Sequence, residues 1–255
     1  MRATFVSWLF VVALGVNFGA LGCRPKPKGR MTVAASVFPI YDLVRRVAGP
    51  DADVVLLQEG SATNAEAAGR ARVGVMVGLG LDPWMQKALE AAAPAGKPPK
   101  ILKVGDHVPT LTTTGKPFDD GTSAADGSTV DPHVWLDPQR ASVMTKAIGE
   151  ELARADATHA AAYRRRADEL SDALDSLDKE VETQTSAWKT RGFATREPDY
   201  GYFADRYHLH AAPAAPAAPG AVPTVTLDAV GGGPDLDSYE KLIRHDVGVL
   251  AAALR

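Results

Sequence analysis

Residues 31–49, MTVAASVFPIYDLVRRVAG, contain two hydrophobic patterns in succession. The stretch 31–37 is a run of small and β-branched residues, which predicts a strand. From residue 39 to residue 48 the apolar positions recur at steps of three and four, which predicts a helix that begins at a proline and ends at Gly49. These apolar residues are Ile40, Leu43, Val44 and Val47. A strand followed at once by a helix is typical of an α/β fold with parallel strands.

The same alternation continues to residue 136. Short apolar runs at 52–57, 73–78 and 100–104 predict further strands, and the segment DPWMQKALEAAA (82–93) predicts a helix between two of them. Strands that alternate with helices form a parallel sheet covered on both faces. We therefore expect residues 31–136 to form an N-terminal α/β lobe.

Residues 137–191 have a helical pattern almost throughout. One helix is expected from Pro138 to Arg154, and a second, much longer one from Thr158 to a point before Gly192. The apolar residues of the second helix, again at steps of three and four, are Tyr163, Ala167, Leu170, Leu174, Leu177 and Val181. At 1.5 Å per residue such a helix spans about 45 Å. This length is sufficient to join two lobes.

Residues 192–255 are few for a second lobe. Their pattern predicts short strands at 193–195 and 224–228 and helices at 199–207 and 235–254. Between these elements lies AAPAAPAAPG (211–220), a low-complexity run that predicts a linker. The expected fold class is therefore α/β, with two parallel-sheet lobes bridged by one long helix and a reduced C-terminal lobe.

Composition restricts the class of ligand. The chain is 45% hydrophobic and 23% charged with a formal net charge of −3, which is ordinary for a folded globular protein. No excess of basic residues is present to bind nucleic acid. A small ligand or an ion fits this composition better.

The first 22 residues predict export. A positive charge at Arg2 precedes the apolar run FVSWLFVVALGV, and small residues lead to Cys23, the one cysteine of the chain. The segment ALGC resembles a bacterial lipobox, with Ala20 where leucine is usual, so we expect lipidation at Cys23. Residues 23–30 would then form a basic, proline-containing tether. The expected location is the bacterial cell envelope, facing the periplasm or the exterior.

The segment DPHVWLDP (131–138) places one histidine between two Asp-Pro turns. His133, Glu197 and Asp228 each follow a predicted strand, and the carboxyl ends of parallel strands are where ligands bind in α/β sheets. One imidazole and two carboxylates suit zinc or manganese. Each residue also has an ordinary structural explanation: a hydrogen-bonded histidine, a helix cap or a turn aspartate.

Enzyme and nucleotide-binding functions find less support. The segment GLGLDP (78–83) has Pro83 where a dinucleotide fingerprint needs its third glycine, and no G-x-S-x-G motif is present. A metal-dependent hydrolase with Glu197 as general base is the remaining enzymatic alternative. Because no motif supplies oxyanion donors, we expect a protein that is not an enzyme.

Five ordered segments together resemble the solute-binding lipoproteins of zinc and manganese ABC importers, a family that includes metal-binding adhesins. They are VAASVFPIYDLVRRVAG, VGLGLDPWMQKAL, DPHVWLDPQRASVMTKAIGEEL, YGYFADRY and LDAVGGGPDLDSYEKLIRHDV. The resemblance implies two α/β lobes bridged by one helix, with a metal bound by four side chains between them. His133 matches the second ligand, Glu197 the third in a manganese-type pattern, and Asp228 the fourth.

The sequence departs from that family at the first ligand. Thr63, in EGSATNAEAA, stands where the family has a histidine, so Glu66 or water would have to complete the site. The second lobe is also short. The resemblance implies capture of the metal and delivery to an ABC permease with its ATPase, by a monomer attached to the membrane through its lipid. The alternative is a degenerate paralogue or adhesin-like envelope lipoprotein with weak or no metal binding.

Overall fold

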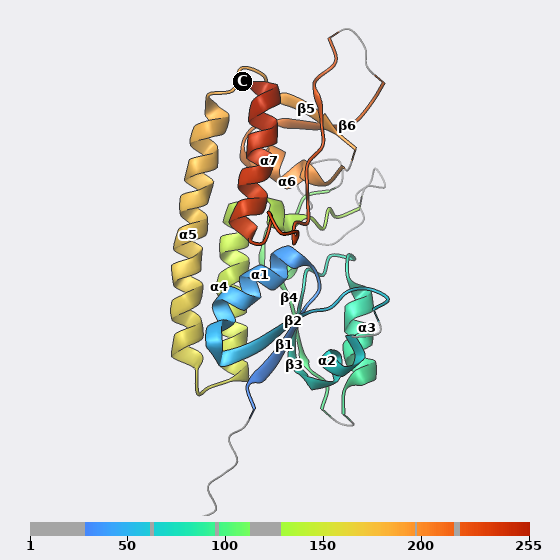
Figure 1. Ribbon diagram of the computed structural model, residues 1–255, viewed down its shortest axis with the longest axis vertical. Helices are drawn as coiled ribbons and strands as arrows, with labels where there is room; N and C mark the ends of the chain where they lie inside the picture. The colour runs from blue at the N-terminus through green and yellow to red at the C-terminus, as the bar shows by residue number, and fades with distance from the viewer. Residues whose placement is uncertain (1–28, 62–63, 95–96, 113–128, 197, 217–219) are drawn as a thin grey trace, which may run out of the picture.

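The computed structural model describes residues 29–61, 64–94, 97–112, 129–196, 198–216 and 220–255. It contains two parallel sheets and one long helix that runs beside both halves of the molecule (Figure 1). The predicted class, α/β with two parallel-sheet lobes and a bridging helix, is confirmed. Among the described helices, none combines the length and the apolar character needed to cross a bilayer.

The first sheet has four parallel strands in the order β2-β1-β3-β4. They are β1 (Met31–Ala35), β2 (Ala52–Leu56), β3 (Ala71–Met76) and β4 (Lys100–Lys103). Val33, Ala34 and Ala35 of the central strand β1 are fully buried, as expected for a strand covered on both faces. The strands predicted at residues 31–37, 52–57, 73–78 and 100–104 are confirmed.

Helices cover both faces of this sheet (Figure 1). Helix α1 (Phe38–Ala48) packs on one face, and α2 (Asn64–Arg70) and α3 (Pro83–Ala92) pack on the other. Helix α2 is absent from the sequence-based prediction, because seven alanine-rich residues carry too short an apolar pattern to indicate it. Short 3-10 turns connect the elements at η1 (Gly49–Asp51), η2 (Val104–His107), η3 (Val134–Leu136) and η4 (Pro198–Tyr200).

Helices α4 (Pro138–Ala155) and α5 (Ala160–Ser186) lie side by side (Figure 1). With 27 residues, α5 is about 40 Å long. Its N-terminal half is joined to the first lobe by Arg166, whose guanidinium donates to the carbonyl oxygens of Val47 and Ala48, each at 2.7 Å. These carbonyls end α1, so the arginine supplies the donors that the last turn of a helix lacks.

The C-terminal half of α5 is joined to the second lobe. Asp178, which is buried, accepts hydrogen bonds from Arg206 Nε at 2.8 Å and from the hydroxyl of Tyr207 at 3.1 Å. Glu180 of the same helix accepts from Arg244 Nη2 at 2.8 Å. The long helix is therefore bonded to both lobes.

The second sheet has three parallel strands in the order β6-β5-β7. They are β5 (Gly192–Thr195), β6 (His210–Pro213) and β7 (Thr224–Val225). Helices α6 (Gly201–Arg206) and α7 (Tyr239–Leu254) complete this lobe. With a strand of two residues and one fewer strand than the first sheet, it is the smaller of the two.

The linker predicted at residues 211–220 is wrong at its start, because β6 includes residues 211–213. The strand is held by hydrogen bonds from His210 N–H to Arg191 O at 2.8 Å and from Ala214 N–H to Thr195 O at 2.9 Å. Pro213 is compatible with this position because β6 is an edge strand, where one N–H is not needed for a ladder. All residues of β6 are exposed, so this strand does not contribute side chains to a core.

Candidate metal site

The segment DPHVWLDP forms a compact turn that ends at the start of α4. Asp131 is buried, and its Oδ1 accepts the backbone N–H of His133 at 3.0 Å. The residues of η3 are buried below the histidine. Asp137 then caps α4 by accepting from the backbone N–H groups of Gln139 at 2.8 Å and Arg140 at 3.4 Å. The second Asp-Pro pair is thus a helix start, and the first orients the histidine.

Asp131 also determines which nitrogen of His133 is available to a ligand. Its Oδ1 lies 2.7 Å from Nδ1 of the ring. Because a carboxylate only accepts, this contact assigns the proton of the neutral imidazole to Nδ1 and leaves the lone pair on Nε2. A carboxylate behind a histidine is the usual arrangement around metal-binding imidazoles, since it fixes the tautomer and increases the basicity of the ligating nitrogen.

On the other side of the ring, Nε2 of His133 lies 3.6 Å from Oδ2 of Asp199. Asp199 belongs to η4, in the second lobe, so two donors from different lobes face each other. The histidine side chain is 21% exposed and the aspartate side chain 18%. The Nε2 lone pair of His133 and the Asp199 carboxylate oxygen are close enough that one cation could bind both.

Trp135 connects this turn to the segment that carries Asp228. Its ring lies edge-on to the His133 ring, with centroids 5.2 Å apart. Its Nε1 donates to the carbonyl oxygen of Ala229 at 2.7 Å, and its own carbonyl accepts from the hydroxyl of Tyr239 at 2.6 Å. The tryptophan therefore limits the movement of the histidine and holds the residue next to Asp228.

Asp228 itself forms a turn. Its Oδ1 accepts from the backbone N–H groups of Val230 at 2.9 Å and Gly231 at 2.8 Å. These are the hydrogen bonds of an aspartate that stabilises a turn. Its backbone N–H donates to Asp246 Oδ1 at 3.0 Å. Hydrogen bonds of this kind position a carboxylate, so they are compatible with Asp228 as a metal ligand and with Asp228 as a turn residue.

Two buried groups lie behind these carboxylates. The hydroxyl of Tyr200 donates to Asp246 Oδ2 at 2.7 Å. Burial raises the pKa of Asp246 to about 6, and the charge of Asp228 acts in the same direction. The pKa of Tyr200 is also raised, first by burial and then by the negative charges of Asp246, Asp228 and Asp199. Asp199 and Asp228 are thus both close enough to Tyr200 for their negative charges to raise its pKa. The surroundings of this site are anionic.

The remaining predicted site residues are separate from this group or lie outside the described residues. Thr63, Glu197 and Cys23 belong to the latter. Glu66 lies on α2 with 82% of its side chain exposed and accepts from Arg70 Nη1 at 2.6 Å, an ordinary i,i+4 surface pair. In the part of the chain that the structure describes, no three His, Cys, Asp or Glu side chains form a group suited to a metal ion.

Two residues of the site are absent from the sequence-based prediction. Asp131 is part of the quoted motif, and its position two residues before His133 is a signal for a turn that bonds back to the ring. Asp199 follows Glu197 by two residues in the same loop, EPDY. The sequence pattern indicates an acidic loop at this place but does not show which of its carboxylates faces the histidine.

Two parallel-sheet α/β lobes joined by one helix, with facing donors from both lobes, define the class of two-lobed binding proteins. Residues 33–226 match the family model described as the periplasmic component A of the zinc-uptake complex, so the chain belongs to this family.

Individual relatives agree with this assignment. A putative metal-binding protein of Treponema pallidum is 33% identical over 141 residues, which are 54% of this chain and 44% of that protein. The high-affinity zinc uptake system protein ZnuA of Paracoccus denitrificans is 31% identical over 97 residues, 38% of this chain and 30% of that protein. The aligned part of the chain thus spans less than half of the length of these relatives.

Among solved structures, the periplasmic zinc binding protein TroA from Treponema pallidum superposes with a TM-score of 0.71 at 18% identity. The superposition covers 88% of this chain and 99% of that one. At this level of identity, the likeness shows the fold.

Proposed function

We propose that this chain binds a divalent transition metal ion outside the cytoplasm and delivers it to an ABC permease driven by an ATPase. Zinc is the first candidate, because the family and the Paracoccus relative carry that name. The observation that supports the proposal most directly is the Asp131–His133–Asp199 arrangement, in which one carboxylate orients the ring and another faces its free nitrogen.

The proposed ligands are His133 through Nε2, an acid of the loop 197–199, and Asp228. Asp131 is a positioning residue. A mixed nitrogen and oxygen set is compatible with zinc and with manganese, and a carboxylate-rich set favours the harder manganese ion. Since Thr63 replaces a histidine of the family pattern, water or a carboxylate would occupy the remaining position.

The test is calorimetric titration of the chain with zinc and with manganese. His133→Ala should weaken binding at least about 10-fold. Asp131→Asn should weaken it by about 10- to 100-fold, because a carboxylate that orients a ligating histidine typically contributes that much. His210→Ala is the matched control, since His210 lies at the amino end of β6, away from the carboxyl ends of the strands. Equal affinities for the wild type, His133→Ala and His210→Ala would contradict the site.

Asp199→Asn and Asp228→Asn separate the two acids. Each should weaken zinc binding at least about 10-fold if it is a ligand or orients one. Lowering the pH should weaken binding to the wild type, because protons compete with the metal for imidazole and carboxylate.

A second candidate function rests on the substitution at Thr63 and on the lack of a three-donor group among the described residues. In this alternative the chain is a degenerate or adhesin-like envelope lipoprotein that keeps the fold with weak or no metal binding. A folded wild-type protein that gives no heat with either ion would support this alternative.

Export and lipid attachment at Cys23 are part of the same proposal. Mass spectrometry of the protein purified from bacterial membranes should show a diacylglyceryl group at Cys23. The variant Cys23→Ala should lose this mass and appear in the soluble extract.

A further inference from the structure

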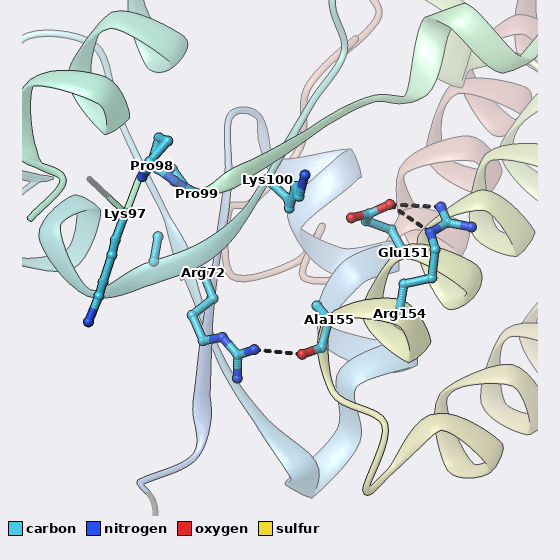
Figure 2. Close-up of a pocket in the computed structure, with 9 residues that line it drawn as sticks. Arg72, Lys97, Pro98, Pro99, Lys100, Glu151, Arg154 and Ala155 are labelled. Carbon is cyan, nitrogen blue, oxygen red and sulfur yellow. Dashed lines mark hydrogen bonds and ion pairs between the residues drawn. The ribbon is translucent and has the colours of Figure 1, made fainter. Parts of the chain in front are cut away.

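A basic pocket lies at the end of the first sheet opposite to the metal site. It is a hollow of about 650 Å³ between the start of β3, the start of β4 and the last turn of α4 (Figure 2). Because the strands are parallel, their amino ends meet here. The pocket includes the last turn of α4, whereas His133 precedes the first turn of that helix. The pocket is therefore independent of the proposed metal site.

The pocket has the opposite charge to the whole chain. Its ionisable side chains are the four cations Arg72, Lys97, Lys100 and Arg154 and one carboxylate, Glu151. Glu151 Oε2 accepts from both Nη2 and Nε of Arg154, at 2.7 and 3.2 Å. Among the described residues, no carboxylate forms an ion pair with Arg72, Lys97 or Lys100. The chain as a whole has a formal net charge of −3, so this excess of positive charge is local.

Part of this charge has a structural role. Arg72 Nη2 donates to Ala155 O at 2.7 Å, at the end of α4, where a cation is favoured by the helix dipole (Figure 2). This contact uses one of the five N–H donors of the guanidinium. No such role explains the two lysines, which are exposed and lie across the hollow from Glu151 and Arg154 (Figure 2). Pro98 and Pro99 separate them and restrict the backbone between them.

Several cationic side chains around one hollow favour an oxyanion. Guanidinium groups bind phosphate through paired N–H donors, and ammonium groups bind it as point charges. The ligand class that this pocket fits is therefore a phosphate group.

The position of the pocket indicates the source of that phosphate. Thr32 of β1 pairs with Ala71 at the start of β3, so the chain enters the first lobe at the end where the pocket opens. Residues 24–30 separate Met31 from the proposed anchor at Cys23, and seven residues span at most about 25 Å. A domain held at this distance keeps the face around its entry point close to the bilayer.

We propose that, while the protein is not docked on its permease, the pocket binds the phosphate of an anionic phospholipid headgroup, so that the first lobe then rests on the membrane with its metal site facing away. Together, two exposed lysines at an anionic membrane surface increase the partition of a protein onto that membrane about 20- to 30-fold. This inference rests on the proposed lipid attachment at Cys23 and does not depend on metal binding.

The test uses residues 29–255, which contain every described helix and strand and exclude the anchor and the segment before it. The fragment is sedimented with vesicles of phosphatidylglycerol and phosphatidylcholine in equal amounts, and with vesicles of phosphatidylcholine alone. We expect binding to the anionic vesicles only, and competition by inorganic phosphate at constant ionic strength. Lys97→Gln/Lys100→Gln should reduce binding about 20- to 30-fold.

The matched control is Lys179→Gln/Lys189→Gln, which removes the same charge from exposed positions on and after α5. Equal losses for the two double variants would overturn the pocket, because attraction would then depend on net charge alone. Binding of inorganic phosphate without binding to vesicles would overturn the lipid source. Thermal unfolding and zinc titration should be the same for both variants and the wild type, which separates this result from a failure of folding or of the proposed metal site.

Discussion

The two sheets of this protein are stabilised in different ways. In the first lobe, four strands lie between helices on both faces, and the centre of β1 is fully buried. In the second lobe, β6 is exposed along its whole length and β7 has two residues. Its stability must come largely from side chains that pack against α5 and α7. The comparison shows that a lobe with a small sheet can be held against the long helix by a few aromatic and ionic contacts.

These contacts form a continuous group. The rings of Phe203 and Tyr207 lie 4.8 Å apart, and Phe203 also meets Tyr200 at 6.4 Å. Tyr207 is bonded to Asp178 of α5, and Tyr200 to Asp246 of α7. Each ring of this group is fully buried. Asp199 precedes Tyr200 of this group, and the proposed ligand Asp228 is bonded to Asp246, which accepts from the Tyr200 hydroxyl. This group, and not a long strand, therefore positions the two acids.

The largest effect expected from this comparison follows removal of the central ring. Phe203→Ala should lower the free energy of unfolding by about 3 to 5 kcal/mol, because it leaves a cavity among aromatic neighbours. Val33→Ala, in the centre of β1, should cost about 2 to 3 kcal/mol. Urea unfolding monitored by circular dichroism measures both. A smaller loss for Phe203→Ala than for Val33→Ala would show that the aromatic group does not hold the second lobe.

The next effect depends on pH. Because the pKa of Asp246 is raised from 3.8 to about 6, its protonated form favours the folded state. Below the unfolded pKa the carboxyl is protonated in both states, and as the pH rises through the folded pKa the folded state becomes less stable. The loss is at most about 3 kcal/mol, since one pKa unit corresponds to about 1.4 kcal/mol.

The variant Asp246→Asn should lack this loss between about pH 4 and pH 7, while it keeps an oxygen that accepts the N–H of Asp228. Asp235→Asn, at an exposed position of the same lobe, should follow the wild-type curve. Urea unfolding at several pH values measures the difference. If the free energy of unfolding of the wild type falls no more steeply with pH than that of Asp246→Asn, burial does not raise the pKa of Asp246 as stated.

A smaller effect is expected at the start of α7. Ser238 Oγ accepts from the backbone N–H of Lys241 at 3.3 Å, and Asp42 of the first lobe accepts from Tyr239 N–H at 3.0 Å. Ser238→Ala should cost about 1 kcal/mol through loss of the cap, and Ser238→Asp should retain the stability. Thermal unfolding checks this pair. Equal destabilisation by both substitutions would show that the hydroxyl does not act as a cap.

The smallest effect is expected on the edge strand. Ala212→Ser, on the exposed β6, should change the free energy of unfolding by less than about 0.5 kcal/mol. Ala34→Ser, in the buried β1, should cost about 1 to 3 kcal/mol, because it buries a hydroxyl in an apolar site. The same chemical change thus compares the two sheets directly. Similar losses at the two positions would contradict the difference in burial on which the comparison depends.

Most of the first lobe was predictable because its signals are local. Each strand is an apolar run and each predicted helix has its own period, so no knowledge of distant partners is needed. Strand β6 was not predictable, because the Ala/Pro run has little strand propensity and forms a strand through its bonds with β5. The division of the chain at residues 31–136, 137–191 and 192–255 stays a prediction.

For the candidate site, the motif DPHVWLDP indicates His133 as a proposed ligand, while the contacts of that histidine depend on the fold. The contact with Asp199 joins two lobes, and the bond of Asp228 to Asp246 joins a turn to a helix. The proposed roles of Glu197, Thr63 and Cys23 stay predictions. Glu66, by contrast, forms a surface pair with Arg70.

The sequence by itself determined the α/β class and the long helix and indicated one histidine as a proposed ligand, because hydrophobic periodicity and turn residues act over a few neighbouring positions. Only the tertiary structure decided which carboxylate orients that histidine, which one faces its free nitrogen, and where the basic pocket opens. These features are contacts between residues far apart in the chain. Their geometry follows from packing of the whole fold, which no local pattern encodes.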